Sequence, residues 1–344
     1  MTKIAIVGAT GYTGMELVRI LSRHPQARLA ALTSRQQAGK LYSRVFPGLL
    51  QAVDLRITDP DYQAIAHKAE MAFLCLPHSE SQDAAAALLK RGLKVIDLSA
   101  DFRLHSAAVY KKWYGPHRYP ALLKQAVYGL PELYRRKIAP ARLVANPGCY
   151  PSSVILGLAP LAAAGVMEPA VIADSKSGVS GAGRSPQQNL HFSEVNENLR
   201  AYQIYGHRHT PEMEQELSAA ARKKVRVTFV PHLAPMNRGI LSTLYVRLTK
   251  KLSLDNLFEI YRGSYQDELF IRLLPAGALP ETAQVRGTNF TQIGLSLAPS
   301  GREAVITCAL DNLVKGAAGA AVQNFNLMQG LPEITALESL PLVP

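Results

Sequence analysis

Hydrophobic and polar positions follow two alternating periods along the first third of the chain. Apolar runs of strand length occur at Lys3–Val7, Ala27–Leu32, Met71–Leu76 and Val95–Leu98. Between these runs, Thr13–His24 and Ser81–Arg91 place their apolar residues at helical spacing. Short apolar strands separated by helices predict a parallel sheet with helices on both faces, which is an α/β arrangement.

The pattern changes after residue 148. A helix over Val154–Ala164 is followed by a strand over Val171–Ser175, and another helix begins near Pro211. Longer strands then succeed one another at Val225–Pro231, Ile240–Leu248, Ile293–Leu297 and Ala304–Leu310. This order predicts an α+β domain with an antiparallel or mixed sheet. We therefore expect a domain over residues 1–148, a second over 149–311, and a last segment, 312–344, with a helix over Leu313–Met328 that is rich in alanine and glycine.

Composition limits the classes of protein to consider. The chain has 344 residues, 48% hydrophobic and 19% charged, which is typical of a folded protein with two domains. The net charge of +12 fits a solvated basic surface or a field that favours anionic cofactors and substrates. No basic block interleaved with aromatic residues is present, so we expect no nucleic-acid partner. No apolar run spans a bilayer and Met1 leads directly into a strand, so we expect a cytoplasmic protein without a membrane partner.

A glycine-rich turn joins the first strand to the first helix. It comprises Gly8, Ala9, Thr10, Gly11, Tyr12, Thr13 and Gly14. Glycines in this context allow a tight turn and let helix amides hold a pyrophosphate, so we predict a Rossmann-type dinucleotide-binding domain. The second strand ends at Ser34 and Arg35, with Lys40 following, where NAD sites usually carry an acidic residue. A hydroxyl and cations suit a 2′-phosphate, so NADP is favoured over NAD.

The three cysteines lie in different settings. Their odd number and wide spacing predict neither a disulfide framework nor a metal site. Cys75 and Cys308 are flanked by strand-like apolar residues and are interpreted as buried packing thiols. Cys149, in NPGCYPSS, precedes a helix, whose positive end favours the thiolate. We therefore predict that Cys149 is a nucleophile that forms an acyl thioester, which a hydride can reduce.

The nucleophile needs a proton donor and acceptor, and His207 and His209 are the best candidates. Both precede Pro211, which suits the first turn of a helix, and Glu212 lies just inside it. We prefer His209 as the general acid/base because it adjoins the helix start, with His207 as the alternative. Glu212 completes the predicted catalytic set.

A loop of small residues follows the strand over Val171–Ser175. The segment from Ser175 to Arg184 offers exposed amides and two cations, which can cradle a phosphate or an acyl oxyanion. Three arginines are unranked anion partners. The predicted substrate site comprises Asn146, Ser177, Gly178, Gly181, Gly183, Arg184, Arg103 and Arg208.

Together these segments resemble the N-acetyl-gamma-glutamyl-phosphate reductases, a family of arginine biosynthesis related to aspartate-semialdehyde dehydrogenases. The resemblance covers essentially the whole chain and rests on GATGYTGMELVRIL, FLCLPHSES, VIDLSADFRL, YGLPELYR, NPGCYP, SGVSGAGR, GHRHTPE and DNLVKGAAGAAVQN. It implies an NADP-dependent, phosphorylating semialdehyde dehydrogenase with Cys149 as the acyl acceptor. It also implies that Pro77 and Ser99 line the cofactor cleft and that Asn312 holds the nicotinamide amide. By the same resemblance, 312–344 returns to the dinucleotide-binding domain, residues 149–311 carry substrate binding and oligomerisation, and chains form homodimers or homotetramers.

Two other functions stay open at the level of sequence. The same chemistry could act on another acyl phosphate, such as aspartyl phosphate or a carrier-bound amino-adipyl phosphate. A protein that senses NADP without catalysis is a remote alternative, because it would be expected to lack Cys149, His207 or His209.

Overall fold

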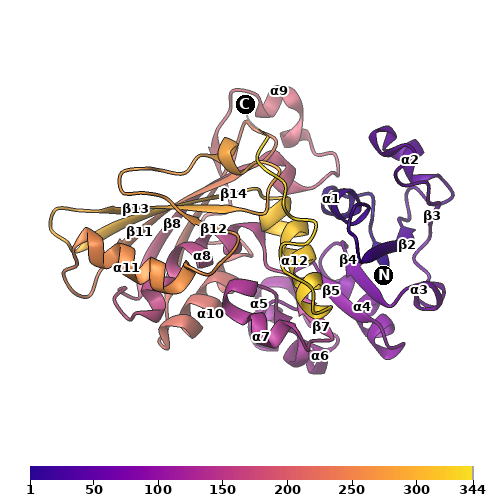
Figure 1. Cartoon of the computed structure of the whole chain (residues 1–344), viewed down its shortest axis with the longest axis horizontal. Coiled ribbons are helices and arrows are strands. Elements are labelled where there is room, and N and C mark those ends of the chain that lie inside the picture. The colour runs from indigo at the N-terminus through magenta and orange to yellow at the C-terminus, as the bar shows by residue number, and fades with distance from the viewer. Residues whose placement is uncertain (343–344) are drawn as a thin grey trace. The chain divides into compact units, whose positions relative to one another are not determined.

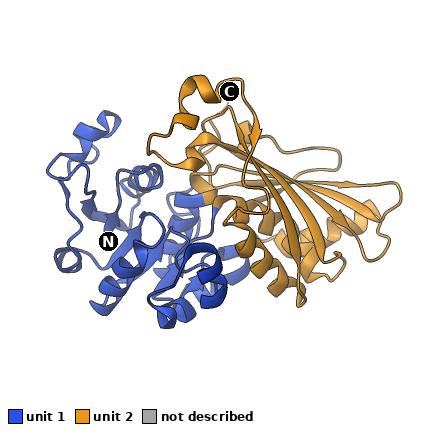
Figure 2. Cartoon of the chain, turned by 180° about the vertical axis from the view of Figure 1, so that it is seen from behind, with its two compact units in different colours: residues 1–148, 317–338 blue, residues 149–316, 339–344 orange. Residues whose placement is uncertain are grey.

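The computed structural model describes residues 1–342, which fold into two compact units (Figure 2). Unit 1 comprises Met1–Gly148 and Ala317–Glu338. Unit 2 comprises Cys149–Gly316 and the described tail from Ser339. The last segment, predicted as 312–344, is therefore divided between the two units, and its final residues 343 and 344 lie outside the described part of the chain.

Unit 1 contains the parallel sheet that the sequence predicts. Its strands are β1 (Thr2–Val7), β2 (Ala27–Thr33), β3 (Ile57–Thr58), β4 (Met71–Leu74), β5 (Lys94–Asp97), β6 (Val127–Tyr128) and β7 (Leu143–Ala145). They pair in the order β3-β2-β1-β4-β5-β7-β6, and every pair is parallel. The helices of the unit are α1 (Tyr12–Leu21), α2 (Tyr42–Val45), α3 (Tyr62–Lys68), α4 (Ser81–Lys90), α5 (Ala107–Tyr114), α6 (Pro120–Gln125), α7 (Pro131–Ile138) and α12 (Gly319–Met328). The strand order is that of a doubly wound dinucleotide-binding fold, as predicted.

Both faces of this sheet are covered, as the continuous apolar strands require. Successive side chains of a strand point to opposite faces. On one face Leu74 of β4 shares a core cluster with Ile65 of α3 and Leu88 of α4. On the other face the ring of Phe73 lies 6.1 Å from that of Phe325 in α12.

The last helix is shorter than the predicted range. A π-helical turn over Val314–Ala318 leads into α12, which ends at Met328. Helix α12 is fastened in unit 1 by its amides: Asn324 Nδ2 donates to Gly129 O at 2.8 Å, and Asn326 Oδ1 lies 2.8 Å from His24 Nε2. Small residues in the first part of α12 allow this close packing.

Unit 2 is built on a second, mixed sheet (Figure 1). Its strands are β8 (Ala170–Gly178), β9 (Arg200–Ala201), β10 (Arg226–Ala234), β11 (Ile240–Arg247), β12 (Ile271–Leu273), β13 (Thr291–Leu297) and β14 (Glu303–Leu310), and its helices are α8 (Cys149–Ala163), α9 (Phe192–Val195), α10 (Thr210–Ala221) and α11 (Leu254–Tyr265). The strand order is β12-β13-β14-β11-β8-β10-β9, with β8/β10 and β12/β13 parallel and the other pairs antiparallel. Helices α8, α10 and α11 lie on one face of the sheet, and its other face is open (Figure 1). The predicted α+β domain with a mixed sheet is confirmed.

The predicted loop from Ser175 to Arg184 begins later than expected. Ser175–Gly178 continue β8, because β10 and β11 both pair with β8 as far as Gly178 or Ser177. A single 3-10 turn follows over Val179–Ala182. Pairing with two neighbouring strands extends β8 through residues whose own propensity is that of a loop.

Helix α8 contains a proline in its interior. Pro160 has no N–H, so the carbonyl of Leu156, four residues earlier, loses its usual donor. The hydroxyl of Tyr265 in α11 donates to Leu156 O at 2.7 Å. Tyr261 OH, one turn earlier, donates to Gly157 O at 2.5 Å. Two tyrosines of α11 therefore satisfy the carbonyls around the proline and join the two helices.

We expect Tyr265→Phe to lower the free energy of unfolding by about 1–3 kcal/mol, because it leaves the buried Leu156 carbonyl without its side-chain donor. Urea denaturation followed by circular dichroism measures the effect. Tyr205→Phe is the matched control, since Tyr205 is 75% exposed in the same unit. Equal stability of the two variants would contradict this account of Pro160.

Candidate active site

Cys149 is the first residue of α8 and is half-buried. The positive end of this 15-residue helix favours a thiolate at that position. A Cβ on Gly316 would lie 2.8 Å from the Cβ of Cys149, so only glycine fits against Cys149 there. Burial raises the pKa of the Cys75 and Cys308 thiols, which keeps both protonated at neutral pH. Cys149 is therefore the thiol whose position suits nucleophilic chemistry.

The side chain next to Cys149 meets both predicted histidines. The ring of Tyr150 lies 5.7 Å from that of His207 and 6.1 Å from that of His209. The two imidazoles lie 4.8 Å apart, and Phe229 of β10 closes the cluster at 5.1 Å from both Tyr150 and His207. The structure thus brings together residues that lie far apart in the sequence.

Burial and hydrogen bonding fix the position and the charge state of His207. It is 9% exposed, and its Nδ1 accepts the backbone N–H of His209 at 3.1 Å. Its Nε2 lies 3.5 Å from the hydroxyl of Tyr202. Burial, followed by the charge of Arg208, lowers the pKa of His207 to about 4. At neutral pH the imidazole ring is therefore uncharged, and its Nδ1 already accepts a hydrogen bond from the backbone.

Stability should fall as the medium is acidified, because unfolding frees His207 to take up a proton. The folded pKa of about 4 lies below the ordinary pKa of 6.5 for histidine, so the full contribution is present above pH 6.5 and is lost as pH falls toward 4. Between pH 7 and pH 5, the protonation of His207 should lower the free energy of unfolding by about 2 kcal/mol. His207→Asn should remove that part of the slope in urea denaturation, whereas replacement of the exposed His191 should not. If the free energy of unfolding depended on pH in the same way in wild type and in His207→Asn, this prediction would be wrong.

Two tyrosines beside Cys149 complete this part of the site. Tyr150 OH donates to His232 O at 2.9 Å, and Tyr202 OH donates to Tyr150 OH at 3.4 Å. Burial raises the pKa of both, that of Tyr202 to about 12, so both hydroxyls stay protonated. Sequence reasoning missed both residues. Tyr150 could have been found from its position next to Cys149 in the sequence. No local sequence signal distinguishes Tyr202 from the other tyrosines.

The start of the predicted substrate loop is closely packed, whereas Gly181–Arg184 are exposed. A Cβ on Gly178 would lie 2.7 Å from the backbone of Asn237, and one on Gly181 would lie 3.1 Å from Ser177 Oγ. Asn312 also belongs here: its Oδ1 accepts Gly239 N–H at 2.8 Å and its Nδ2 donates to Ser180 Oγ at 2.9 Å. Both ends of the Asn312 amide thus support unit 2. Each end has capacity for a second hydrogen bond, and the predicted contact with the nicotinamide amide stays a prediction. The remaining predicted residues of unit 2 are Gly183, Arg184 and Arg208, which are exposed, and Glu212, which is buried in the first turn of α10.

The glycine-rich turn of unit 1 has the geometry of a phosphate cradle. Gly8 has φ +85°, and its Cβ would lie 2.3 Å from Cys75 O. A Cβ on Gly14 would lie 2.4 Å from Gly8 O, so α1 approaches the turn closely. Gly11 precedes α1, and among the described residues no side chain caps the first turn of that helix. Its amides therefore suit a pyrophosphate.

The residues predicted to read the 2′-phosphate lie at the end of β2. Ser34 Oγ is 2.8 Å from Thr10 Oγ1, which joins β2 to the glycine-rich turn. Arg35 is 68% exposed and its Nη1 lies 2.9 Å from Glu80 Oε2. Lys40 is exposed and donates to Gln37 Oε1 at 3.0 Å. These exposed cations fit an anionic group at this edge of unit 1.

Four predicted residues follow the carboxyl ends of neighbouring strands in unit 1. Pro77, after β4, is exposed, and Ser99, after β5, is buried with its Oγ donating to Asp97 at 2.7 Å. Asn146, after β7, donates to Ala317 O at 3.0 Å. Arg103 is 6% exposed and donates to Asn146 O and Leu98 O at 2.8 and 2.7 Å. These bonds tie strand ends within unit 1, and the substrate contacts expected of Arg103 and Asn146 stay a prediction.

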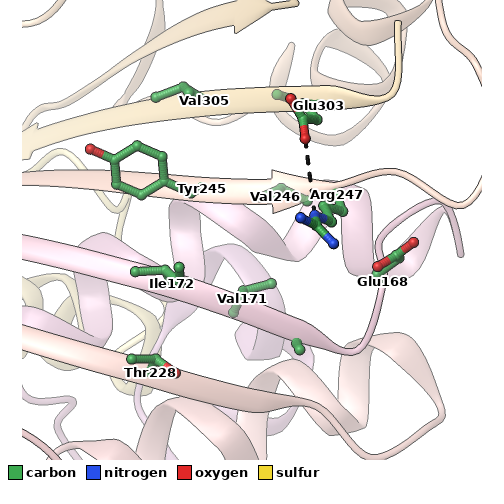
Figure 3. A pocket seen from close by; sticks show the side chains of 11 residues that line it. Glu168, Val171, Ile172, Thr228, Tyr245, Val246, Arg247, Glu303 and Val305 are labelled. Carbon is green, nitrogen blue, oxygen red and sulfur yellow. Dashed lines mark ion pairs between the residues drawn. The ribbon is translucent and has the colours of Figure 1, made fainter. Parts of the chain in front are cut away.

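A separate hollow of about 530 Å³ lies on the open face of the unit 2 sheet (Figure 3). Tyr245, Ile172 and Val305 lie along its strands, and Arg247 pairs with Glu303 at 4.0 Å across two of them (Figure 3). None of the residues around Cys149 lines it. It is therefore distinct from the candidate active site. No helix in the described part of the chain has the length and apolar character needed to cross a membrane.

Comparison with known proteins agrees with the geometry. Residues 3–141 match the family model for the semialdehyde dehydrogenase NAD binding domain, and residues 149–312 match that for the semialdehyde dehydrogenase dimerisation domain. Among solved structures, aspartate semialdehyde dehydrogenase II of Vibrio cholerae, complexed with ASA, shares the fold with a TM-score of 0.74 at 19% identity, covering 96% of this chain and 98% of its own. Aspartate semialdehyde dehydrogenase of Candida albicans, solved with NADP, gives a TM-score of 0.69 at 16% identity, covering 96% and 98%.

Curated relatives are much closer in sequence. N-acetyl-gamma-glutamyl-phosphate reductase of Geotalea daltonii is 52% identical over 346 residues, covering 100% of both chains. The protein of the same name from Magnetococcus marinus is 51% identical over 345 residues, covering 99% of both. Identity at this level over the full length shows that the chain belongs to the N-acetyl-gamma-glutamyl-phosphate reductase family, within the semialdehyde dehydrogenases.

Proposed function

We propose that this chain reduces N-acetyl-gamma-glutamyl phosphate to the 5-semialdehyde and inorganic phosphate with NADPH, as a step of arginine biosynthesis. The observation that carries the proposal is Cys149 at the start of α8, beside the cluster of Tyr150, His207 and His209. Relatives that carry the name of this reductase share about half of their residues with the chain over its whole length.

The first half of the reaction is acyl transfer. The thiolate of Cys149 attacks the acyl carbon, a carbon–sulfur bond forms, and the carbon–oxygen bond to phosphate breaks. Inorganic phosphate leaves with the electron pair of that bond. Backbone amides at the start of α8 suit the developing oxyanion, because their dipoles already point toward it.

The second half is reduction of the thioester. When NADPH is bound, its nicotinamide would supply a hydride to the thioester carbon. The carbon–sulfur bond then breaks, the aldehyde leaves, and the sulfur departs as thiolate or takes a proton from a nearby acid. We assign that proton to His209, because His207 is neutral and its Nδ1 is bonded to the backbone.

Two further assignments refine the predicted sites. Arg184 and Arg208 are the proposed partners for the substrate's anionic groups, because both are exposed in unit 2 whereas Arg103 is buried against carbonyls. Ser34, Arg35 and Lys40 are proposed to bind the 2′-phosphate of NADP, and the amides before α1 to bind the pyrophosphate. We keep Pro77 and Ser99 as proposed neighbours of the cofactor.

The reverse reaction tests the substrate. NADPH formation is followed by its near-ultraviolet absorbance with N-acetylglutamate semialdehyde, phosphate and NADP. Aspartate semialdehyde, the aldehyde of a carrier-bound amino-adipyl substrate, and NAD serve as comparisons. Phosphate-dependent signal with the acetylated aldehyde and NADP alone supports the proposal. Turnover of another aldehyde instead would transfer the same chemistry to that acyl phosphate, and NADP binding without any turnover would indicate a sensing protein.

We also propose that the open face of the unit 2 sheet is the contact between two copies of the chain. Ile172 and Tyr245 are 47% and 45% exposed on this face, which is unusual for large apolar side chains at the centre of a sheet. The matching family model is that of a dimerisation domain. A homodimer would bury this surface, and a homotetramer would need a second contact.

Tyr245→Asp should shift the protein from dimer to monomer, because the carboxylate would be buried without a partner in the contact. Light scattering coupled to size exclusion gives the mass. Leu269→Asp is the control, as Leu269 is 49% exposed but does not line the hollow of this face. A dimer that survives Tyr245→Asp would place the contact elsewhere.

A further inference from the structure

Three serine hydroxyls form a continuous hydrogen-bonded row beneath the start of α8. Ser175 of β8 and Ser242 of β11 stand directly opposite each other in the antiparallel pair. Ser242 Oγ lies 2.7 Å from Ser175 Oγ and 2.7 Å from Ser153 Oγ of α8. All three side chains are fully buried. The row therefore links one helix to two strands through the interior of unit 2.

The row has a fixed direction. Ser153 Oγ donates its proton to the carbonyl of Tyr150 at 2.9 Å. A hydroxyl carries one proton, so Ser153 must accept from Ser242, and Ser242 must then accept from Ser175. The row runs from β8 through β11 into α8, and it ends on the residue that follows Cys149.

Helix α8 needs such a link, because hydrophobic burial does not set its rotation about its own axis. Every residue from Tyr150 to Ala162 is buried, so α8 has no polar face that would orient it toward solvent. Burial of apolar area is non-directional, whereas hydrogen bonds are directional. The hydroxyl row fixes the first turns of α8 to β8 and β11, and the bond from Tyr150 OH to His232 O fixes them to β10.

We propose that Ser242 is a positioning residue for Cys149. Standing at the centre of the row, it sets the rotation and depth of the first turn of α8. It thereby sets the alignment of the thiol with the helix axis and with the amides that receive the oxyanion. Ser242 acts through Ser153 and Tyr150. This inference rests on the proposed role of Cys149 as nucleophile.

The test compares Ser242→Ala with the wild-type protein in two measurements. We expect kcat to fall about tenfold while KM for NADPH and for the acyl phosphate stays within about twofold. We also expect the pH midpoint of Cys149 alkylation by iodoacetamide, read by mass spectrometry of its peptide, to rise as the thiol leaves the helix axis. Ser242→Thr keeps the hydroxyl and should restore both values. Thr288→Val is the control: Thr288 is fully buried in unit 2 and its Oγ1 donates to Val285 O at 2.9 Å.

The outcomes separate positioning from stability. Thr288→Val should lower stability and leave kcat and alkylation unchanged. If Ser242→Ala behaves in the same way, the row is merely structural and the proposal is overturned. If Ser242→Ala does not fold, Ser175→Ala removes only the first hydroxyl, and unchanged kcat and alkylation in that variant also overturn it. Alkylation does not depend on turnover, so a failure of the proposed substrate would leave this readout intact.

Discussion

Cys149→Ser should lower kcat/KM for acyl-phosphate reduction by at least about 10³-fold while NADPH still binds as in the wild type. The thiol at the start of α8 is favoured as thiolate by the helix dipole, whereas a serine hydroxyl in the same place remains protonated. Loss of the thioester leaves hydride transfer without an acceptor. The residues proposed to bind the pyrophosphate and the 2′-phosphate lie in unit 1, so calorimetric titration of NADPH should give a Kd within about twofold of wild type.

Cys308→Ser provides the matched control for this variant. Cys308 is buried in β14, and burial raises the pKa of its thiol. That replacement should affect stability but not the chemical step. Rapid mixing with the acyl phosphate in the absence of NADPH adds a second reading, because one equivalent of phosphate should be released by wild type and none by Cys149→Ser. Phosphate release or near-normal reduction by Cys149→Ser would rule out a covalent intermediate on this residue.

Local sequence patterns predict those parts of the fold that depend on neighbouring residues in the chain. The glycines of the first turn could be assigned because tight turns and close helix approach exclude other residues, as the contacts a Cβ would make at Gly8 and Gly14 show. The parallel sheet of unit 1 and the mixed sheet of unit 2 follow from the order of apolar runs. The loop predicted for residues 176–178 is wrong, because their strand depends on pairing with β10 and β11 rather than on their own propensity.

The site could be predicted only where the chemistry is visible in one segment. Cys149 and the histidine pair stand in short motifs, so their residue types indicate their use. Tyr202 and Ser242 acquire their contacts from segments far away in the chain, and nothing beside them in the sequence marks them. Arg103 is a different case: its charge predicts an anion partner, and in the fold its guanidinium also donates to two backbone carbonyls, which no local pattern indicates. Charge alone does not reveal whether a guanidinium faces a ligand or the protein interior.

His209→Asn should lower kcat about 10²- to 10⁴-fold, the range for loss of a general acid/base, whereas His207→Asn should cost no more than about tenfold. The difference follows from their bonds. His207 Nδ1 accepts the N–H of His209, an interaction that the Oδ1 of asparagine can reproduce, and burial already keeps the ring neutral. His209 is half-buried, and its ring lies 6.1 Å from that of Tyr150, the neighbour of Cys149. The pH profile of kcat should lose a limb in His209→Asn and keep it in His207→Asn. A larger loss in His207→Asn would reverse the assignment and make His207 the general acid/base.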